Sequence, residues 1–534
     1  MLGQMKTQTQ SYWQDEFAVT QEDIEFIYSL LIETGTPLLS DEIARALIEE
    51  RVEKEINQIR LNLKRGRIYQ PRDEYKVGDG IVFPALDGKF GVVVAERPGY
   101  NPEYGDFTVI QVQIEGENKA REFASRLTAP HKQNRGDSAD AILASLSNAS
   151  SDEIFALYGR LIQQKVEQAL FSSDNLDFVR FGKAWYLKGL LADVHIGHRN
   201  IVEAVLDVNG APLGPEELLR QIDLPPDIPA EARLFSLNYA LEHDERFVDV
   251  GADDRVLWFL RRLEPAEAQQ PPHRLIPTSP TYDRSVLTRE MLLLEKELDD
   301  EWSEVEWPRS ELADVSSVSF TLTYPHYRAG TIPLTQRIQQ LFPKGSTQHT
   351  RVTLIDGQSG NHIPAWVVHP HRYVYGLEHW YRANRILAGS YLTLEKTDDP
   401  FTVIINFRPK REKREWIRAA SADGNQLRFE MRKEACRCEY DDLMVIGEDN
   451  REKIDALWLR LTEEQVPFEP IVHQVFLELA KLSPQGTVHA KTLYAAVNVA
   501  RRCPPGPIFA VLATNAQFSE VGDGYWLFNK PEGV

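Results

Sequence analysis

The chain has 534 residues, 42% of them hydrophobic and 10% aromatic, so several globular domains are expected rather than one core. Its formal net charge of −20 argues against a protein that coats nucleic acid non-specifically, although a local basic face remains compatible with it. No run of about 18 apolar residues occurs, so no membrane span is predicted, and three cysteines without an apolar leader predict a cytoplasmic protein that lacks a disulfide framework.

The N-terminal part of the chain predicts a helical domain followed by a β domain. Residues 18–70 contain the stretch TGTPLLSDEIARALI, in which a Gly-x-Pro turn precedes a helix, and we expect a further helix from Val52 to Arg65. Residues 74–128 alternate in short strands separated by glycine turns, which predicts a small SH3-like barrel. The entry YKVGDGIVFP resembles Tudor-type modules that touch RNA polymerase.

Three later stretches share the pattern of a β-ribbon in which aromatic residues follow a glycine turn. They are NLDFVRFGKAWYLK at residues 175–188, RFVDVGADDRVLWFL at 246–260 and NAQFSEVGDGYWLF at 515–528. The first follows one long helical stretch, and we expect residues 140–190 to be a degenerate winged unit, with the ribbon as part of the next domain as the alternative. Each of the other two follows three predicted helices, in domains expected at residues 198–263 and 466–530.

These last two domains resemble the HARE-type winged helix-turn-helix family, whose relatives include the delta subunit of bacterial RNA polymerase. The resemblance rests on the glycine turn before the second helix and on the aromatic ribbon that closes each unit. It implies three helices followed by a two-stranded wing. In the C-terminal copy, Arg501 and Arg502 are therefore candidates for contact with DNA.

A linker is expected at residues 264–315, between the second and third ribbons. Its first part is rich in Pro, Gln and Ser, which predicts an extended chain. From Asp283 to Ser316 the sequence has eleven acidic and four basic residues in a helical pattern. Three interpretations stay open: a solvated helix, a docking surface for a basic partner, and a shield for a neighbouring basic face.

Residues 316–446 have an order of strands and short helices that predicts another α+β domain. The stretches GTIPL, VTLIDG, AWVV and YGLEHWYRANRILAGSYLTLE fall at the start of the first helix, in a strand pair, and in a second helix with its following strand. This order resembles the DNA-binding pseudobarrel family of plant transcription factors and restriction-enzyme recognition domains.

In that family two loops act as arms that grip the major groove, and the match places them at residues 324–330 and 369–375. An arginine can bind O6 and N7 of guanine through two hydrogen bonds, while Tyr and His can donate to phosphates. The candidate contacts are His326, Tyr327 and Arg328 in the first arm and His371, Arg372 and Tyr373 in the second.

A basic run follows the predicted arms. Residues 406–438 contain ten basic and five acidic residues, in contrast to the acidic chain as a whole. Either a solvated β-hairpin or a phosphate-binding surface accounts for this run. Its candidate DNA contacts are Lys410, Arg411, Lys413 and Arg414.

The sequence lacks the motifs of common catalytic and cofactor sites, such as a P-loop, Gly-x-Ser-x-Gly or His-Glu-x-x-His. Cys436, Cys438 and Cys503 do not have the paired spacing of a zinc site. We therefore expect a protein that is not an enzyme and that binds no metal and no cofactor.

These patterns together predict a multidomain α+β protein with winged helix-turn-helix domains, an SH3-like barrel and a DNA-binding pseudobarrel. The expected function is sequence-specific binding of double-stranded DNA, as in a transcriptional regulator, with the barrel arms in the major groove. One alternative is an adaptor that docks on RNA polymerase or another protein. The other is the DNA-recognition subunit of a restriction or defence system. No membrane partner is expected.

Overall fold

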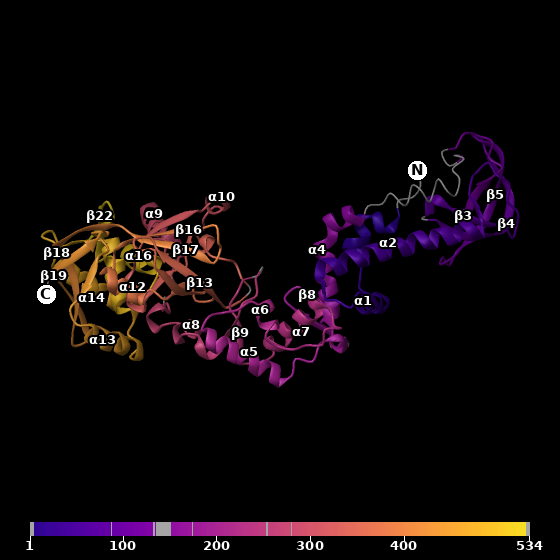
Figure 1. Cartoon of the computed structure of the whole chain (residues 1–534). Coiled ribbons are helices and arrows are strands. Elements are labelled where there is room, and N and C mark those ends of the chain that lie inside the picture. Colours follow the sequence, from indigo (N-terminus) through magenta and orange to yellow (C-terminus); the bar gives the residue numbers. More distant parts are fainter. Residues whose placement is uncertain are drawn as a thin grey trace. The chain divides into compact units, whose positions relative to one another are not determined.

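The chain is a mixed α+β protein with several separate sheets, as expected (Figure 1). The computed structural model describes residues 5–86, 88–131, 134, 151–172, 175–252, 255–278, 280–345 and 347–529. Predicted domain boundaries at 140 and 530 lie outside these ranges. The chain divides into one compact unit of residues 1–195 and 223–240 and a second of residues 196–222 and 241–534. Within the described ranges, no helix is both long enough and apolar enough to cross a membrane.

The first unit contains the long helices of the N-terminal region. They are α1 (Gln21–Thr34), α2 (Ser40–Arg65) and α4 (Ser151–Leu170), and most of α7 (Ala230–Glu242) belongs to the same unit. The predicted break before Val52 is wrong, because α2 is one continuous helix. The reason is local: the stretch IEERVEKEI has neither Gly nor Pro, and its residues tolerate a helix.

Two sheets complete the first unit. A five-stranded sheet has the order β2-β3-β4-β5-β6 and covers most of the range predicted as a β domain. Its strands are β2 (Arg67–Ile68), β3 (Gly80–Phe83), β4 (Lys89–Asn101), β5 (Gly105–Ile114) and β6 (Arg121–Ser125). A three-stranded sheet has the order β1-β8-β7, with β1 (Leu38–Leu39), β7 (Phe178–Phe181) and β8 (Ala184–Leu187). Because β1 pairs with β8, residues 18–70 and 140–190 share one sheet although we predicted separate domains there.

The three predicted ribbons are all β-hairpins, formed by β7–β8, by β9 (Phe247–Asp249) with β10 (Trp258–Leu260), and by β22 (Phe518–Gly522) with β23 (Tyr525–Phe528). In each case a short segment before a helix pairs antiparallel with the second strand of the hairpin. These segments are β1, Leu213 and β21 (Thr487–His489). The same topology therefore occurs three times in the chain.

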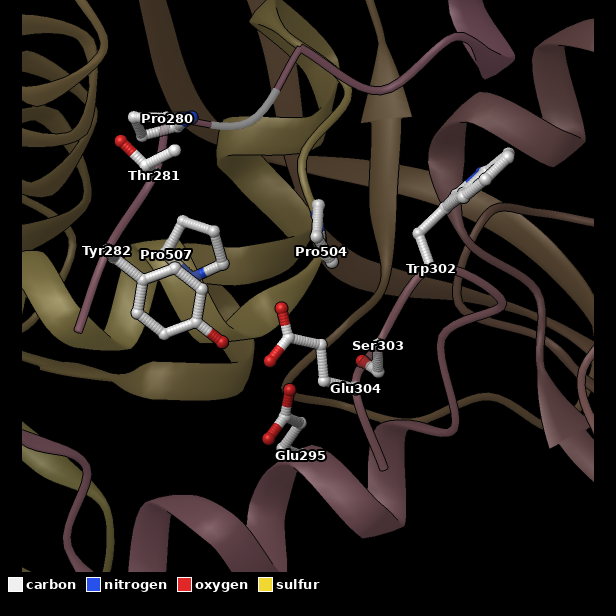
Figure 2. A pocket seen from close by; sticks show the side chains of 9 residues that line it. All are labelled: Pro280, Thr281, Tyr282, Glu295, Trp302, Ser303, Glu304, Pro504 and Pro507. Atoms are coloured by element: carbon white, nitrogen blue, oxygen red, sulfur yellow. The ribbon is translucent and has the colours of Figure 1, made fainter. Parts of the chain in front are cut away.

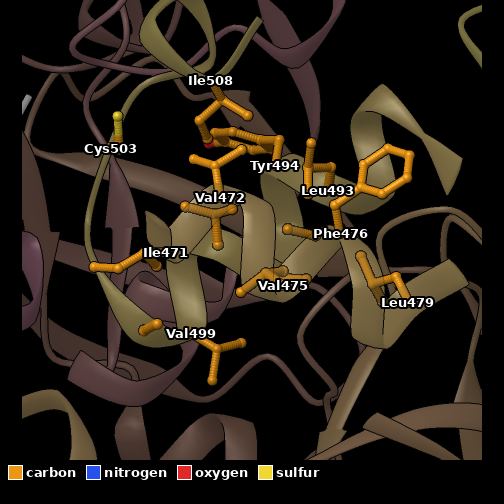
Figure 3. Close-up of a cluster of buried hydrophobic side chains, with 14 of the residues drawn as sticks. Ile471, Val472, Val475, Phe476, Leu479, Leu493, Tyr494, Val499, Cys503 and Ile508 are labelled. Atoms are coloured by element: carbon orange, nitrogen blue, oxygen red, sulfur yellow. The ribbon is translucent and has the colours of Figure 1, made fainter. Parts of the chain in front are cut away.

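The helices of these repeats also follow a common order. The middle copy has α5 (Ile196–Asn209), α6 (Pro215–Leu219) and α7, and the last has α14 (Phe468–Ala480), α15 (Ala490–Ala500) and α16 (Pro505–Thr514). In the first copy, α1 and α2 are followed in sequence by the five-stranded sheet before α4 supplies the third helix. Figure 3 shows the apolar side chains of α14, α15 and α16 that meet in the core of the last copy.

The second unit contains a seven-stranded sheet of order β11-β16-β17-β13-β14-β15-β12, in which β13 and β17 run parallel. Its strands are β11 (Ser317–Thr321), β12 (Thr331–Pro333), β13 (His349–Asp356), β14 (His362–Val368), β15 (Tyr373–Tyr375), β16 (Tyr391–Lys396) and β17 (Thr402–Phe407). Two short helices, α11 (Tyr324–Ala329) and α12 (Glu378–Asn384), lie between strands in the sequence. The core of this part includes Val318, Leu354, Val367 and Leu394.

The first predicted arm is not a loop, because residues 324–329 form α11. Pro325 lies in the first turn of α11, and Gly330 ends the helix with a φ of 66°. Proline in the first turn and a left-handed glycine after the last are typical boundaries of a helix. The second predicted arm is a turn of residues 369–372 followed by β15.

The basic run forms a long hairpin of β18 (Pro409–Asp423) and β19 (Gln426–Cys438), and β20 (Ile446–Glu448) pairs with β18. The remaining helices of the second unit are α8 (Ala266–Gln269), α9 (Arg289–Leu298), α10 (Arg309–Leu312) and α13 (Arg451–Glu463). The acidic part of the linker thus contains α9 and α10, in agreement with the predicted helical pattern.

Candidate nucleic-acid interface

The β18–β19 hairpin exposes a small set of cations that have no ionic partner. Arg411, Lys413 and Arg414 are exposed, and none of them forms an ion pair with any described residue. Trp416 follows Arg414 at the next position on the same face of β18, and its side chain is 60% exposed. Nζ of Lys433, opposite Trp416 on β19, lies 5.2 Å from the centre of the indole ring. We call Arg411, Lys413, Arg414, Trp416 and Lys433 the hairpin patch.

Other bases of the same hairpin are neutralised locally. Arg437 pairs with Glu412 at 3.1 Å and Arg428 with Asp423 at 2.8 Å. Lys410 is half-buried and donates a hydrogen bond to Glu415, which lowers the pKa of that carboxyl. Lys410 is therefore less available to a phosphate than the three neighbouring cations.

The residues of the first predicted arm lie inside the protein or in ion pairs. The His326 side chain is buried, with Nδ1 2.8 Å from the Thr331 hydroxyl and Nε2 3.1 Å from a Glu301 oxygen. Arg328 is 7% exposed and donates to Glu448 and Asp455, at 2.7 Å in each case. Although burial opposes ionisation of Glu448, Arg328 keeps the pKa of this carboxyl below its ordinary value.

Tyr327 is half-buried and its ring lies 6.2 Å from that of Tyr381, so it packs against the sheet domain. The assignment of His326 and Arg328 to a DNA-gripping loop is therefore wrong for this conformation. Both ring nitrogens of His326 and both terminal nitrogens of Arg328 already have partners, which are Thr331 and Glu301 for His326 and Glu448 and Asp455 for Arg328.

The second predicted arm is only partly at the surface. Tyr373 is buried, and its hydroxyl donates to the Glu267 carbonyl at 2.5 Å. Arg372 is exposed and has a φ of 56°, but its guanidinium donates to the Glu301 carbonyl at 2.8 Å and lies 4.7 Å from the Trp302 ring centre. His371 is half-buried, and burial lowers its pKa, with a smaller effect from His349. Tyr373 is thus excluded as a direct contact, whereas Arg372 is exposed but engaged.

The two arginines expected to contact DNA from the C-terminal repeat are also engaged within the protein. The Arg502 guanidinium is 1% exposed and donates to Asp300 at 2.8 Å and to Glu301 at 2.6 Å. Arg501 donates to the carbonyl oxygens of Val466 and Leu461, at 2.6 and 2.9 Å. The proposed role of Arg502 at a DNA surface is therefore contradicted by its burial.

The acidic linker supplies several of the partners described above. Besides the Arg502 contacts, Glu297 pairs with Lys491 of α15 at 2.8 Å. Of the three interpretations of this segment, the contacts match a shield for neighbouring basic residues.

A pocket of about 280 Å³ lies beside this segment, where Tyr282 and Pro507 face Pro504 across the space in Figure 2. The buried Glu295 at its base pairs with Arg284 at 2.7 Å, so its charge is balanced within the chain. Among the described residues, no group of three or more His, Cys, Asp or Glu side chains has a geometry suited to a metal ion.

No family model, curated protein or solved structure matches this chain.

Sequence reasoning missed a second candidate surface, on α4 and the turn of the β7–β8 hairpin. Arg160, Gln164 and Gln168 recur at spacings of four residues on α4 and are exposed. Lys183 is exposed in the turn of the hairpin. We call these four residues the α4 face. The third helices of the other two copies differ: α16 exposes only Ala513 and Thr514, and α7 exposes Ala230 and two glutamates.

The sequence around α4 did not by itself identify the α4 face. Arg, Gln and Asn at exposed positions are the side chains that bind base edges, but α4 could be read as a third helix only after β1 was known to pair with β8.

Proposed function

We propose that this protein binds double-stranded DNA through the hairpin patch. The observation that carries the proposal is the cluster of Arg411, Lys413 and Arg414, which have no ion pair with any described residue in a chain of net charge −20. Cations without an ion pair attract phosphates, and the exposed Trp416, on the same face of β18 as Arg414, adds a stacking surface for a sugar or base.

We further propose that each of the three repeats is a winged helix-turn-helix module. The support is the order of three helices and a hairpin, together with the short segment that pairs with the second strand of the hairpin. Of the three copies, the first has a third helix with Arg and Gln at exposed positions. We assign sequence readout to the α4 face in preference to the predicted arms, because His326, Arg328 and Tyr373 are buried.

The seven-stranded sheet with α11 and α12 supports the pseudobarrel interpretation of residues 316–446, and the five-stranded sheet supports the SH3-like one. In this account the barrel is a scaffold that holds the hairpin patch, while transcriptional regulation is the biological role that fits such a DNA-binding protein. An adaptor function remains the second candidate, favoured by the burial of residues that a DNA-reading barrel would expose.

The test of the proposal is charge reversal in the hairpin patch. The variant Arg411→Glu/Lys413→Glu/Arg414→Glu should bind duplexes of any sequence more weakly. The logarithm of its affinity should also fall less steeply with the logarithm of salt concentration, by about 2 to 3 in the slope, because each lost phosphate contact removes about 0.9. Fluorescence anisotropy with a labelled duplex measures both quantities.

A matched control separates a local contact from a change in overall charge. The variant Lys76→Glu/Lys119→Glu/Arg289→Glu reverses three exposed cations that lie outside the hairpin patch. It should retain the wild-type salt slope. If both variants lose affinity and slope equally, or if neither does, the hairpin patch is not the contact.

A further inference from the structure

The first unit contains a pocket that the DNA-binding proposal does not use. Its volume is about 420 Å³, and it lies between one face of α1 and the segment that leads into β7. From α1 it is lined by Gln21, Ile24, Glu25, Tyr28 and Ser29, and from the other side by Asn175, Asp177 and Phe178. The α1 residues recur at helical spacing, so they line the pocket along one face of the helix.

The pocket combines aromatic walls with uncompensated negative charge. The rings of Tyr28 and Phe178 meet edge to face, with centroids 6.2 Å apart. Glu25 and Asp177 form no ion pair with any described residue, although several other carboxylates of this unit are paired. Phosphates would be repelled by these two carboxylates, so nucleic acid is a poor occupant.

Apolar residues continue from the pocket over the neighbouring surface. Ile32, one turn after Tyr28 on α1, is 51% exposed, and Leu176, beside Asp177, is 78% exposed. Exposed apolar residues around a charged pocket are typical of a surface that binds another protein. A bound segment would therefore need a cation for the pocket and apolar side chains for its rim.

We propose that this pocket is a docking site for a segment of a partner protein in which an arginine is flanked by apolar residues. The guanidinium would lie against the rings of Tyr28 and Phe178 and donate hydrogen bonds to the carboxylates of Glu25 and Asp177. Arginine fits better than lysine, because its planar guanidinium stacks on aromatic rings and presents several donors at once. The apolar neighbours would cover Ile32 and Leu176. This inference stands independently of the DNA-binding proposal.

The test selects peptides from a random seven-residue library displayed on phage, with the intact chain as the target. The recovered peptides should be enriched in arginine next to Leu, Ile, Phe or Tyr. A synthetic copy of the strongest binder is then titrated by calorimetry. The variant Glu25→Gln/Asp177→Asn should weaken its binding by about tenfold or more, as expected when charge-assisted hydrogen bonds are lost.

The control is Glu49→Gln/Glu53→Gln, which removes two exposed carboxylates of α2 in the same unit that do not line the pocket. It should change peptide affinity by less than about twofold, since exposed charges at a distance are screened. The proposal is overturned if no arginine-containing peptides are enriched, or if Glu25→Gln/Asp177→Asn binds them as tightly as the wild type. Duplex binding of both variants should equal that of the wild type, so a failure of this inference is distinguishable from a failure of the DNA-binding proposal.

Discussion

Arg502 was predicted from the sequence to contact DNA, but in the structure it is a buried residue that pairs with two carboxylates. Its guanidinium is enclosed with Asp300 and Glu301 and is the arginine that pairs with both, beside the contacts of Tyr494 with Asp300 and of His326 with Glu301. Replacement by methionine leaves two buried carboxylates without their cation. Arg502→Met should therefore lower the free energy of unfolding by about 3–5 kcal/mol, measured by urea denaturation.

An arginine of the hairpin patch serves as the control for Arg502. Arg411→Met should change stability by no more than about 0.5 kcal/mol, because the side chain is exposed and has no ion pair among the described residues. An Arg502→Met protein that is as stable as the wild type but binds DNA more weakly would restore Arg502 as a contact.

Asp244 links the stability of the second unit to pH. Hydrogen bonds from Arg246, at 2.7 and 2.9 Å, lower the pKa of Asp244 from 3.8 to about 2. A carboxyl with a lowered pKa in the folded state stabilises the protein above its unfolded pKa, and this contribution is lost as pH falls through the folded pKa. Asp244→Asn should therefore melt at a lower temperature than the wild type at pH 7.

The difference in melting temperature between Asp244→Asn and the wild type should shrink as pH falls from about 4 toward about 2, because the wild-type carboxyl then takes up a proton. Calorimetric scans at pH 7 and pH 3 measure this change. A difference that is equal at both pH values would show that Asp244 acts without its charge.

At the scale of elements, Gly389 precedes β16 at a point where a side chain cannot be accommodated. It has a φ of 96°, and a Cβ atom built there would lie 2.5 Å from Cα of Val445. Gly389→Ala adds backbone strain and a clash with main-chain atoms, and we expect a loss of stability of about 2 kcal/mol or more in thermal or urea denaturation.

The tip of the β18–β19 hairpin supplies the control for this substitution. Gly424 also has a positive φ, of 57°, but a Cβ atom there meets nothing within 4 Å. Gly424→Ala should cost about 1 kcal/mol, from backbone strain alone. If the two substitutions lower stability equally, the close approach of Val445 to Gly389 does not contribute to the loss.

The α4 face carries a prediction about specificity. Gln164→Ala should weaken binding to a duplex obtained by DNA selection by about 1–3 kcal/mol and leave binding to a scrambled duplex nearly unchanged, because a base contact contributes only at its own site. Thr514→Ala, at an exposed position of α16, is the matched control and should change neither affinity. Equal losses on both duplexes would make Gln164 a backbone contact.

Local patterns in the sequence predicted some elements and missed others. Alternation of apolar and polar residues around glycine turns correctly located all three ribbons. The helix at residues 324–329 was missed although Pro325 and Gly330 mark its ends, because the family resemblance favoured a loop there. The pairing of β1 with β8 could not be predicted, since the whole five-stranded sheet lies between them in the sequence and short strands carry little periodicity.

For the candidate site, too, the sequence predicted some features and missed others. Charge composition pointed correctly to an exposed basic hairpin, but it could not show which bases are paired. Lys410 is engaged with Glu415 while Arg411 has no ion pair with a described residue, and only the cross-strand geometry distinguishes them. The burial of His326 and Arg328 depends on carboxylates far away in the sequence, on the acidic linker and α13, which no local pattern identifies.

At the scale of the whole molecule, the chain is acidic, and many of its described basic residues, such as Arg246, Arg328 and Arg502, form ion pairs with carboxylates. The three repeats share one topology but expose different side chains. Among the helices that precede the hairpins, α4 exposes Arg and Gln, α16 is nearly all buried, and α7 exposes two glutamates. A strongly acidic protein repels DNA at long range, so binding should be confined to the few surfaces where cations remain free.

Photo-cross-linking locates the residues that a bound duplex contacts. The intact protein is irradiated at low salt with a duplex that carries 5-iododeoxyuridine, which reacts with nearby aromatic side chains, and the cross-linked peptides are mapped by mass spectrometry. We expect cross-linked peptides from Pro409–Cys438 that include Trp416 and that disappear in Arg411→Glu/Lys413→Glu/Arg414→Glu. The absence of any cross-link to Pro409–Cys438, or cross-links to this hairpin that persist in the triple variant, would contradict this expectation.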